Sequence, residues 1–118
     1  MPRSDSLGQF EQLVLTAVVT LGENAYGVTI HKRVRDLASS VSVTLGAIYV
    51  TLDRLEDKGY VSSWLSEPTA ARGGRAKRCY RLEASGERAL RESIATARRM
   101  ASSVRSIWRD LDEELGEA

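Results

Sequence analysis

The stretch from residue 44 to residue 64 constrains the fold of this chain more than any other part. Apolar residues recur in it at spacings of three and four, which is typical of a helix with one buried side. These apolar residues are Leu45, Ile48, Leu52 and Leu55. Thr44 is a suitable N-cap, and Lys58-Gly59 is a suitable helix end. We therefore predict a helix over residues 44–58 that runs through one glycine into a strand over residues 60–67.

Two amphipathic helices are predicted before this stretch. Their apolar spacings place the first over residues 7–21 and the second over residues 26–38. The second helix should carry Leu37 among its core residues, while its other side is basic and includes His31, which is expected to be solvated or to contact phosphate. Residues 41–43 are β-branched and short, so only a minor strand edge is expected there.

A basic β-hairpin is predicted after the central helix. Its second strand covers residues 78–83, and the loop before it contains proline and two glycines. No acidic residue occurs between Pro68 and Leu82. The basic residues of the hairpin are Arg72, Arg75, Lys77, Arg78 and Arg81. A solvated loop gains nothing from excluding carboxylates, whereas a phosphate-binding loop does, because each neutralised phosphate releases counterions. Phosphate contact is therefore favoured over a merely solvated surface.

The segment over residues 84–115 predicts a long helix, because it is rich in Ala, Arg and Glu and lacks proline. Its apolar positions alternate spacings of four and three, which is the pattern of a heptad seam. The seam residues are Leu90, Ile94, Ala97, Ala101, Val104, Trp108, Leu111 and Leu115. Nothing else in the chain repeats this pattern, so the simplest partner is the same helix of a second copy in a homodimer. Trp108 would pack in that interface or stack on a ligand.

Composition excludes several classes of protein. The 118 residues, 42% of them hydrophobic, allow one globular domain and an appendage. Cys79 and His31 are single residues of their types, so an intrachain disulfide and a Cys/His zinc site are excluded, and no cofactor is expected. No apolar run approaches the roughly 18 residues of a membrane helix and no signal peptide is visible, so a cytoplasmic protein is expected.

Together these features predict a fold that is mainly α with a small β-hairpin. A winged helix-turn-helix DNA-binding domain is expected at residues 1–83, followed by a C-terminal dimerisation helix at residues 84–118. In this fold the helix over residues 44–58 enters the major groove of double-stranded DNA and the hairpin follows the phosphates. The residues expected to face the groove are Thr44, Ala47, Tyr49, Val50, Thr51 and Arg54. The residues expected to contact phosphates are Arg72, Arg75, Lys77 and Arg78 in the hairpin and Lys32 and Arg35 in the second helix.

Other functions remain as alternatives at this point. A winged-helix module that binds a protein, and a ligand-sensing dimer without specific DNA binding, have the same elements. Catalysis is disfavoured, because a triad would have to use His31 within a basic helix, and no nucleophile, nucleotide or metal motif accompanies it.

Short motifs along the chain, over about residues 7–90, carry a resemblance to a known family. They are Leu7-Gly8-Gln9-Phe10-Glu11, Tyr26-Gly27, Leu45-Gly46-Ala47-Ile48-Tyr49, Leu52-Asp53-Arg54-Leu55-Glu56, Gly59-Tyr60-Val61, Gly74-Arg75, Lys77-Arg78, Tyr80-Arg81-Leu82 and Ser85-Gly86. In combination they resemble the PadR family of bacterial winged-helix transcriptional regulators. The sequence departs from the family at Val50 and Ala76, where proline is common, and these departures affect local DNA contacts.

The resemblance implies a homodimeric repressor that binds a two-fold operator and dimerises through its C-terminal helix. Some members of the family release DNA when they bind phenolic acids or planar drug-like compounds, in several cases between the C-terminal helices. This makes Trp108 a candidate platform for a small planar or aromatic effector.

Overall fold

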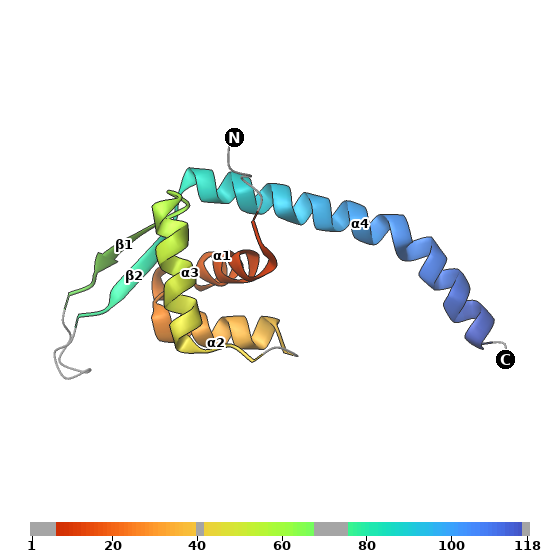
Figure 1. The fold of residues 1–118 in the computed structure, drawn as a ribbon, viewed down its shortest axis with the longest axis horizontal. Coiled ribbons are helices and arrows are strands. Elements are labelled where there is room, and N and C mark those ends of the chain that lie inside the picture. The colour runs from red at the N-terminus through yellow and green to blue at the C-terminus, as the bar shows by residue number, and fades with distance from the viewer. Residues whose placement is uncertain (1–6, 40–41, 68–75, 117–118) are drawn as a thin grey trace.

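The computed structural model describes residues 7–39, 42–67 and 76–116 of the chain (Figure 1). Its elements are α1 (Gln9–Leu21), the short 3-10 helix η1 (Gly22–Asn24), α2 (Gly27–Leu37), α3 (Leu45–Asp57), β1 (Val61–Leu65), β2 (Arg78–Leu82) and α4 (Ala84–Gly116). Each α-helix and each hairpin strand ends within two residues of its predicted limits. The prediction of a mainly helical chain with a small hairpin and a long C-terminal helix is confirmed.

The hairpin is fastened to the turn before α2. Tyr26 forms an isolated antiparallel bridge with Cys79, and the Tyr80 N–H donates to the Ala25 carbonyl over 2.8 Å. The contact is a single isolated bridge beside the two-stranded sheet of β1 and β2. The minor strand edge expected at residues 41–43 does not form in the part that the structure describes.

Apolar side chains of α1, α2 and α3 meet in one core, which the hairpin closes. The largest fully buried side chains are Val14, Leu15, Ile30, Val34, Ile48, Leu52, Leu55, Val61 and Tyr80. The prediction that Leu37 lies in the core is wrong: it is the last residue of α2, past the edge of the core, and is 47% exposed. His31 is half-buried rather than solvated, and its Nε2 lies 2.7 Å from the Val43 carbonyl, to which it donates. His31 therefore ties α2 to the segment that leads into α3.

A buried carboxylate joins the first turn of α1 to the end of α3. Glu11 is 7% exposed. Its Oε1 accepts from the Gly8 N–H over 3.0 Å, and its Oε2 accepts from Lys58 Nζ over 2.9 Å. Burial alone would raise the pKa of Glu11, but the hydrogen bonds from Lys58 and Gly8 and the positive charges of Lys58 and Arg54 together hold the pKa below its ordinary value. Because Lys58 is the C-cap of α3, this pair fixes the end of that helix on α1.

The start of α4 packs against the turn between α3 and β1. Gly59 has a φ of 79°, in the left-handed region that glycine adopts without strain. Ser85 Oγ donates to the Gly59 carbonyl over 2.7 Å. A Cβ on Gly86 would overlap the Tyr60 carbonyl, so a glycine is needed for this close approach. The first turn of α4 is therefore in direct contact with the turn that links α3 to β1.

The 33 residues of α4 form one long helix, which passes over α1 and then extends away from the domain in a curve (Figure 1). Leu90 is 7% exposed and belongs to the core of its own domain, so its placement on the dimer seam is corrected. The uncovered seam begins one turn later at Ile94, which is 41% exposed. Neither α4 nor any other described helix is long and apolar enough to cross a membrane.

Candidate nucleic-acid interface

The uncovered side of α3 presents a short stripe to solvent. Ala47, Val50 and Arg54 follow one another at spacings of three and four, and all three are exposed. Thr44 precedes the helix and is also exposed; its Oγ1 accepts from the Ala47 N–H over 3.1 Å and caps the first turn. A valine beside an arginine suits base readout, because apolar side chains contact thymine methyl groups and arginine donates to guanine.

Thr51 does not belong to this stripe. It is 4% exposed and lies on the buried side of α3 with Ile48 and Leu55, three positions before it and four after it. The expectation that Thr51 faces a groove is therefore wrong. The physical reason is that a helix on a globular core buries a stripe at least about 100° wide, which includes positions beside the strict apolar series.

Tyr49 lies between the exposed stripe and α2. Its ring and hydroxyl lie over Gly27, the first residue of α2, where a Cβ would overlap the hydroxyl oxygen and two ring carbons. Tyr49 is nevertheless 40% exposed. Its side chain is therefore packed on the neighbouring helix while part of its surface stays accessible.

The hairpin brings a lysine to the same end of α2. The antiparallel pairing of β1 with β2 continues beyond the strands, where the Ser66 N–H donates to the Lys77 carbonyl over 2.7 Å. Lys77 Nζ lies 3.6 Å from the centre of the Tyr26 ring, a cation–π contact. Tyr26 is the N-cap of α2 and the neighbour of Gly27. Lys77 and Tyr49, from two different elements, therefore meet adjacent residues at the start of α2.

Arg78 and Arg81 lie on opposite faces of the hairpin. Arg78 Nη1 donates to Ser63 Oγ over 2.9 Å, and Ser63 Oγ donates to Glu56 Oε2 of α3 over 2.8 Å. Arg78 is thus on the face turned towards α3. The Arg81 guanidinium lies 5.4 Å from the centre of the Trp64 ring. Alternation along the strand places this pair on the face opposite to Arg78.

The remaining predicted phosphate contacts are only partly located. Lys32 and Arg35 are exposed on α2, as contact with a phosphate requires. Arg72 and Arg75 lie outside the described residues. Of the predicted set, the structure therefore brings Tyr49 and Lys77 together at the start of α2, while Ala47, Val50 and Arg54 are exposed along α3.

Sequence reasoning missed the residues that hold this surface in place. Tyr26 and Gly27 were visible only as the opening of a helix, although one carries Lys77 and the other makes room for Tyr49. Ser63 had no visible sign, yet it links the hairpin to α3. Helical periodicity reports neighbours within one element, so it cannot find contacts between elements.

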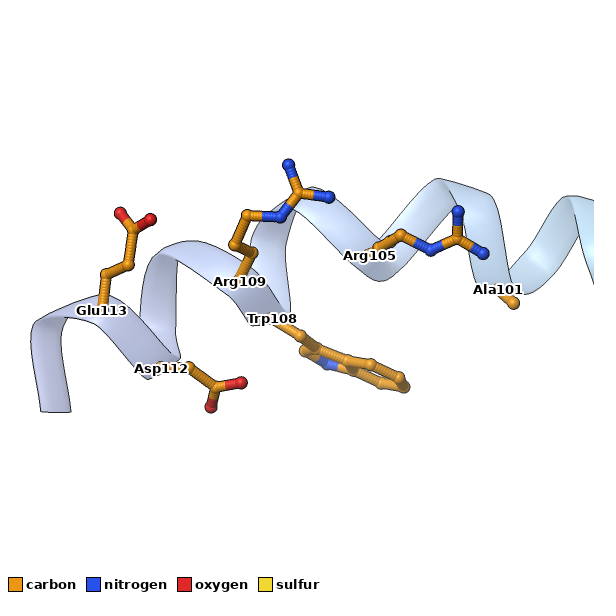
Figure 2. A pocket seen from close by; sticks show the side chains of 6 residues that line it. All are labelled: Ala101, Arg105, Trp108, Arg109, Asp112 and Glu113. Atoms are coloured by element: carbon orange, nitrogen blue, oxygen red, sulfur yellow. The ribbon is translucent and has the colours of Figure 1, made fainter. Parts of the chain in front are cut away.

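A second candidate site lies on the exposed part of α4. Figure 2 shows the side chains that line a shallow hollow along α4, with the Trp108 ring projecting away from the helix. The lining residues are Ala101, Arg105, Trp108, Arg109, Asp112 and Glu113. Trp108 is 61% exposed, and Leu111 and Leu115 further along the seam are 49% and 74% exposed. Uncovered apolar surface of this extent on one helix indicates an interaction surface.

Comparisons with known proteins show similarity in sequence profile and in fold. The profile of the transcriptional regulator PadR-like family matches residues 14–92. A PadR family transcription regulator from Clostridium difficile R20291 is similar in structure, with a TM-score of 0.70 and 26% identity, over 86% of this chain and 99% of that chain. The protein smu.1704 from Streptococcus mutans UA159 is similar with a TM-score of 0.66 and 25% identity, over 85% of this chain and 86% of that chain.

A structure of Bacillus subtilis PadR in complex with operator DNA has the same fold. Its TM-score is 0.60 at 22% identity, over 71% of this chain and 46% of that chain. No curated protein sequence matches the chain.

The family profile extends from α1 to the first turns of α4, which is more than half of the chain. The resemblance carried by the short motifs is thereby confirmed. The chain belongs to the PadR-like family of transcriptional regulators.

Proposed function

We propose that the protein is a homodimeric repressor that binds double-stranded DNA at a two-fold operator. The observations that carry this proposal are the accessible stripe of α3 and the meeting of Lys77 and Tyr49 at the start of α2. In a winged helix-turn-helix, such a helix lies in the major groove while neighbouring cations contact the phosphates. Membership of the PadR-like family supports the proposal, as does the operator complex of Bacillus subtilis PadR.

The proposed contacts divide into two groups. Base readout is assigned to the exposed groups on α3 and at its start, Thr44, Ala47, Tyr49, Val50 and Arg54. Phosphate contact is assigned to the basic residues Lys32, Arg35, Arg72, Arg75, Lys77 and Arg78. Phosphate contacts set position and affinity but carry no sequence information, so the two groups should fail differently when mutated.

Dimerisation through α4 supplies the second recognition helix. One short helix contacts only a few base pairs, and two copies related by a two-fold axis read two half-sites at a fixed spacing. The exposed seam from Ile94 to Leu115 is the surface assigned to this contact.

The test is a mobility shift with the DNA upstream of the protein's own gene, against scrambled DNA of the same length, at several salt concentrations. Specific binding that survives about 150 mM salt supports the proposal. Weak binding that is equal for both DNAs and disappears with salt would instead support a protein-interaction module. Val50→Ala changes the proposed readout stripe of α3. Arg81→Ala is its control, since Arg81 lies over Trp64 and is not among the proposed contacts.

A small planar or aromatic effector completes the proposal, with Trp108 as its platform. Trp108 and Trp64 are the two tryptophans of the chain, and they lie on different elements. Quenching of fluorescence by a planar aromatic acid should survive Trp64→Phe and vanish in Trp108→Phe, and the same compound should release the operator. Release requires that the ligand prefer one dimer arrangement over the other. Quenching without any operator binding would support a ligand-sensing dimer instead.

A further inference from the structure

We propose that two copies of α4 pair antiparallel in one defined register, centred between Ser102 and Ser103. This inference rests on the homodimer proposed above and goes beyond it by naming which residues of the two copies meet. The spacings of the uncovered seam from Ile94 to Leu111 run 3, 4, 3, 4, 3, which reads the same in both directions. An antiparallel copy turned about the point between Ser102 and Ser103 therefore places a seam position opposite every seam position from Ile94 to Leu111.

The paired side chains are complementary in size. The register sets Ile94 opposite the partner's Leu111, Ala97 opposite the partner's Trp108, and Ala101 opposite the partner's Val104. A parallel pair would put two Trp108 rings in one layer and two alanines in each of two others. Such layers are alternately overfilled and empty, and both faults destabilise an interface. The antiparallel register gives the large ring of Trp108 the small Ala97 as its neighbour.

Two apolar residues outside the seam fit the same register. Met100 and Ile107 are 61% and 57% exposed, and both lie at the position just before a seam residue. In the antiparallel pair Met100 flanks the partner's Ile107, so these two side chains cover each other. In a parallel pair the flanking contacts would set Met100 beside an arginine and Ile107 beside an aspartate.

The charges along α4 favour the same direction. Arginines are concentrated over residues 98–109, and residues 110–114 are acidic except for Leu111. A parallel pair would bring each of these charged segments against its own copy. The antiparallel register instead brings Arg91 beside the partner's Asp112. Arg91 can contact the partner's Asp112, because its ion pair with Glu87, at 2.9 Å, lies on the exposed surface, where ion pairs contribute little stability.

One contact in this register is unfavourable, and it limits the role of charge. Arg98 comes opposite the partner's Arg105 on the flank that also holds the Arg91–Asp112 pair. Two arginines that face each other repel, so the packing of the seam rather than charge must fix the register.

Registers displaced by one heptad fit less well. Displacement in one direction sets Trp108 opposite the partner's Leu90, which is already buried in the core of its own domain. Displacement in the other direction sets Met100 beside the partner's Glu114 and leaves Ile94 without a seam partner. The register centred between Ser102 and Ser103 keeps each seam residue from Ile94 to Leu111 opposite an uncovered seam residue, and only Leu115 falls opposite Leu90.

Cysteine cross-linking of the full-length chain tests this register. Ile94→Cys and Leu111→Cys proteins are mixed, oxidised and mapped by mass spectrometry, which also identifies any product of the native Cys79. A disulfide between position 94 of one copy and position 111 of the other is expected. Equal positions would lie about 25 Å apart along the helices, since each residue adds 1.5 Å, and a disulfide needs Cα atoms within about 7 Å.

Three other outcomes of cross-linking and sedimentation would overturn the inference, each in a distinct way. Disulfides within each single variant, 94 to 94 and 111 to 111, indicate a parallel pair. A disulfide that forms when Ile94→Cys is mixed with Val104→Cys, and not with Leu111→Cys, indicates a register displaced by one heptad. A native chain that sediments as a monomer removes the homodimer as well. Operator binding measured on the cross-linked protein is a separate readout, so its loss would count against the DNA-binding function and leave the register standing.

A size swap provides an independent test. Ala97→Trp and Trp108→Ala should each weaken dimerisation at least about tenfold, because one overfills and the other empties the same layer. In the antiparallel register the double variant restores a small residue opposite a large one, so its dimer affinity should recover most of that loss. A double variant as weak as the two losses combined would overturn the pairing of these two positions.

Discussion

Lys58 Nζ donates to Glu11 Oε2 over 2.9 Å, and this contact joins two residues that are 47 positions apart in the sequence. The same carboxylate accepts from the Gly8 N–H, so one side chain both caps α1 and holds the end of α3. The orientation of α3, the proposed recognition helix, therefore depends on a carboxylate that lies outside the proposed DNA contacts.

Glu11→Gln should lower the free energy of unfolding at pH 7 by about 1–3 kcal/mol, because a charged hydrogen bond is lost at a buried site. The effect should depend on pH. The folded pKa lies below the ordinary value of 4.5, so the stabilisation is full above that pH and is lost as the pH falls through the folded pKa. Urea unfolding at pH 7 and pH 3, at one protein concentration, measures it. The exposed Glu23→Gln is the matched control, and an equal acid response of both variants would contradict the prediction.

Gly27→Ala should destabilise the domain by about 1–3 kcal/mol, because the new methyl group overlaps the Tyr49 hydroxyl and ring. Combining it with Tyr49→Ala should cost less than the sum of the two single changes, as expected for residues in contact. Gly46→Ala is the control, since Gly46 is exposed and a Cβ there meets no atom closer than 4.0 Å. Additive effects in the Gly27 and Tyr49 cycle would show that the two residues do not interact.

Lys77→Ala and Arg78→Ala should each weaken binding to operator and random DNA by a similar factor. Each should also reduce the slope of log affinity against log salt by about one, because one phosphate contact is lost. The double change of Arg75 and Lys77 should reduce the slope by about two. Arg81→Ala, on the face opposite to Arg78 and with its guanidinium over Trp64, should leave the slope unchanged. An unaltered slope in all variants would remove the hairpin from the interface.

Val50→Ala and Tyr49→Ala should reduce the ratio of operator to random DNA affinity, because both side chains are exposed at the proposed readout surface. A loss of about 1 kcal/mol or more at the operator is expected for a base contact. Thr51→Val is the informative control, since Thr51 is 4% exposed and cannot reach a base edge from the core. Competition binding with labelled operator measures the ratio. A change caused by Thr51→Val and not by Val50→Ala would contradict the assignment.

The elements of this fold could be predicted because each leaves a periodic pattern in its own residues. The helix at residues 44–58 and the seam on α4 are both visible as spacings of three and four. The predicted exposure was wrong at residues whose burial depends on packing against another element. Thr51 is covered because the buried stripe of α3 is wide, and Leu90 is covered because α4 begins on the core.

The contacts that arrange the candidate interface were not predictable for a related reason. The packing of Tyr49 on Gly27 and of Lys77 on Tyr26 joins segments that are distant in the sequence. Such contacts depend on how whole elements are placed against one another. Sequence periodicity therefore predicted a helix with an exposed side, but not what holds its neighbours in position.

The short stretch of α4 between the buried Leu90 and the first uncovered seam residue, Ile94, sets an angle as well as a distance. One residue inserted there would turn the seam by about 100° relative to the winged domain, which would point the dimer surface in a new direction. In the proposed dimer, seven inserted residues would preserve the direction and move each domain about 10 Å further from the two-fold axis, close to three base-pair steps of 3.4 Å. The number of residues in this one turn of helix therefore sets both the direction of the proposed dimer surface and the spacing of the two α3 helices along a proposed operator.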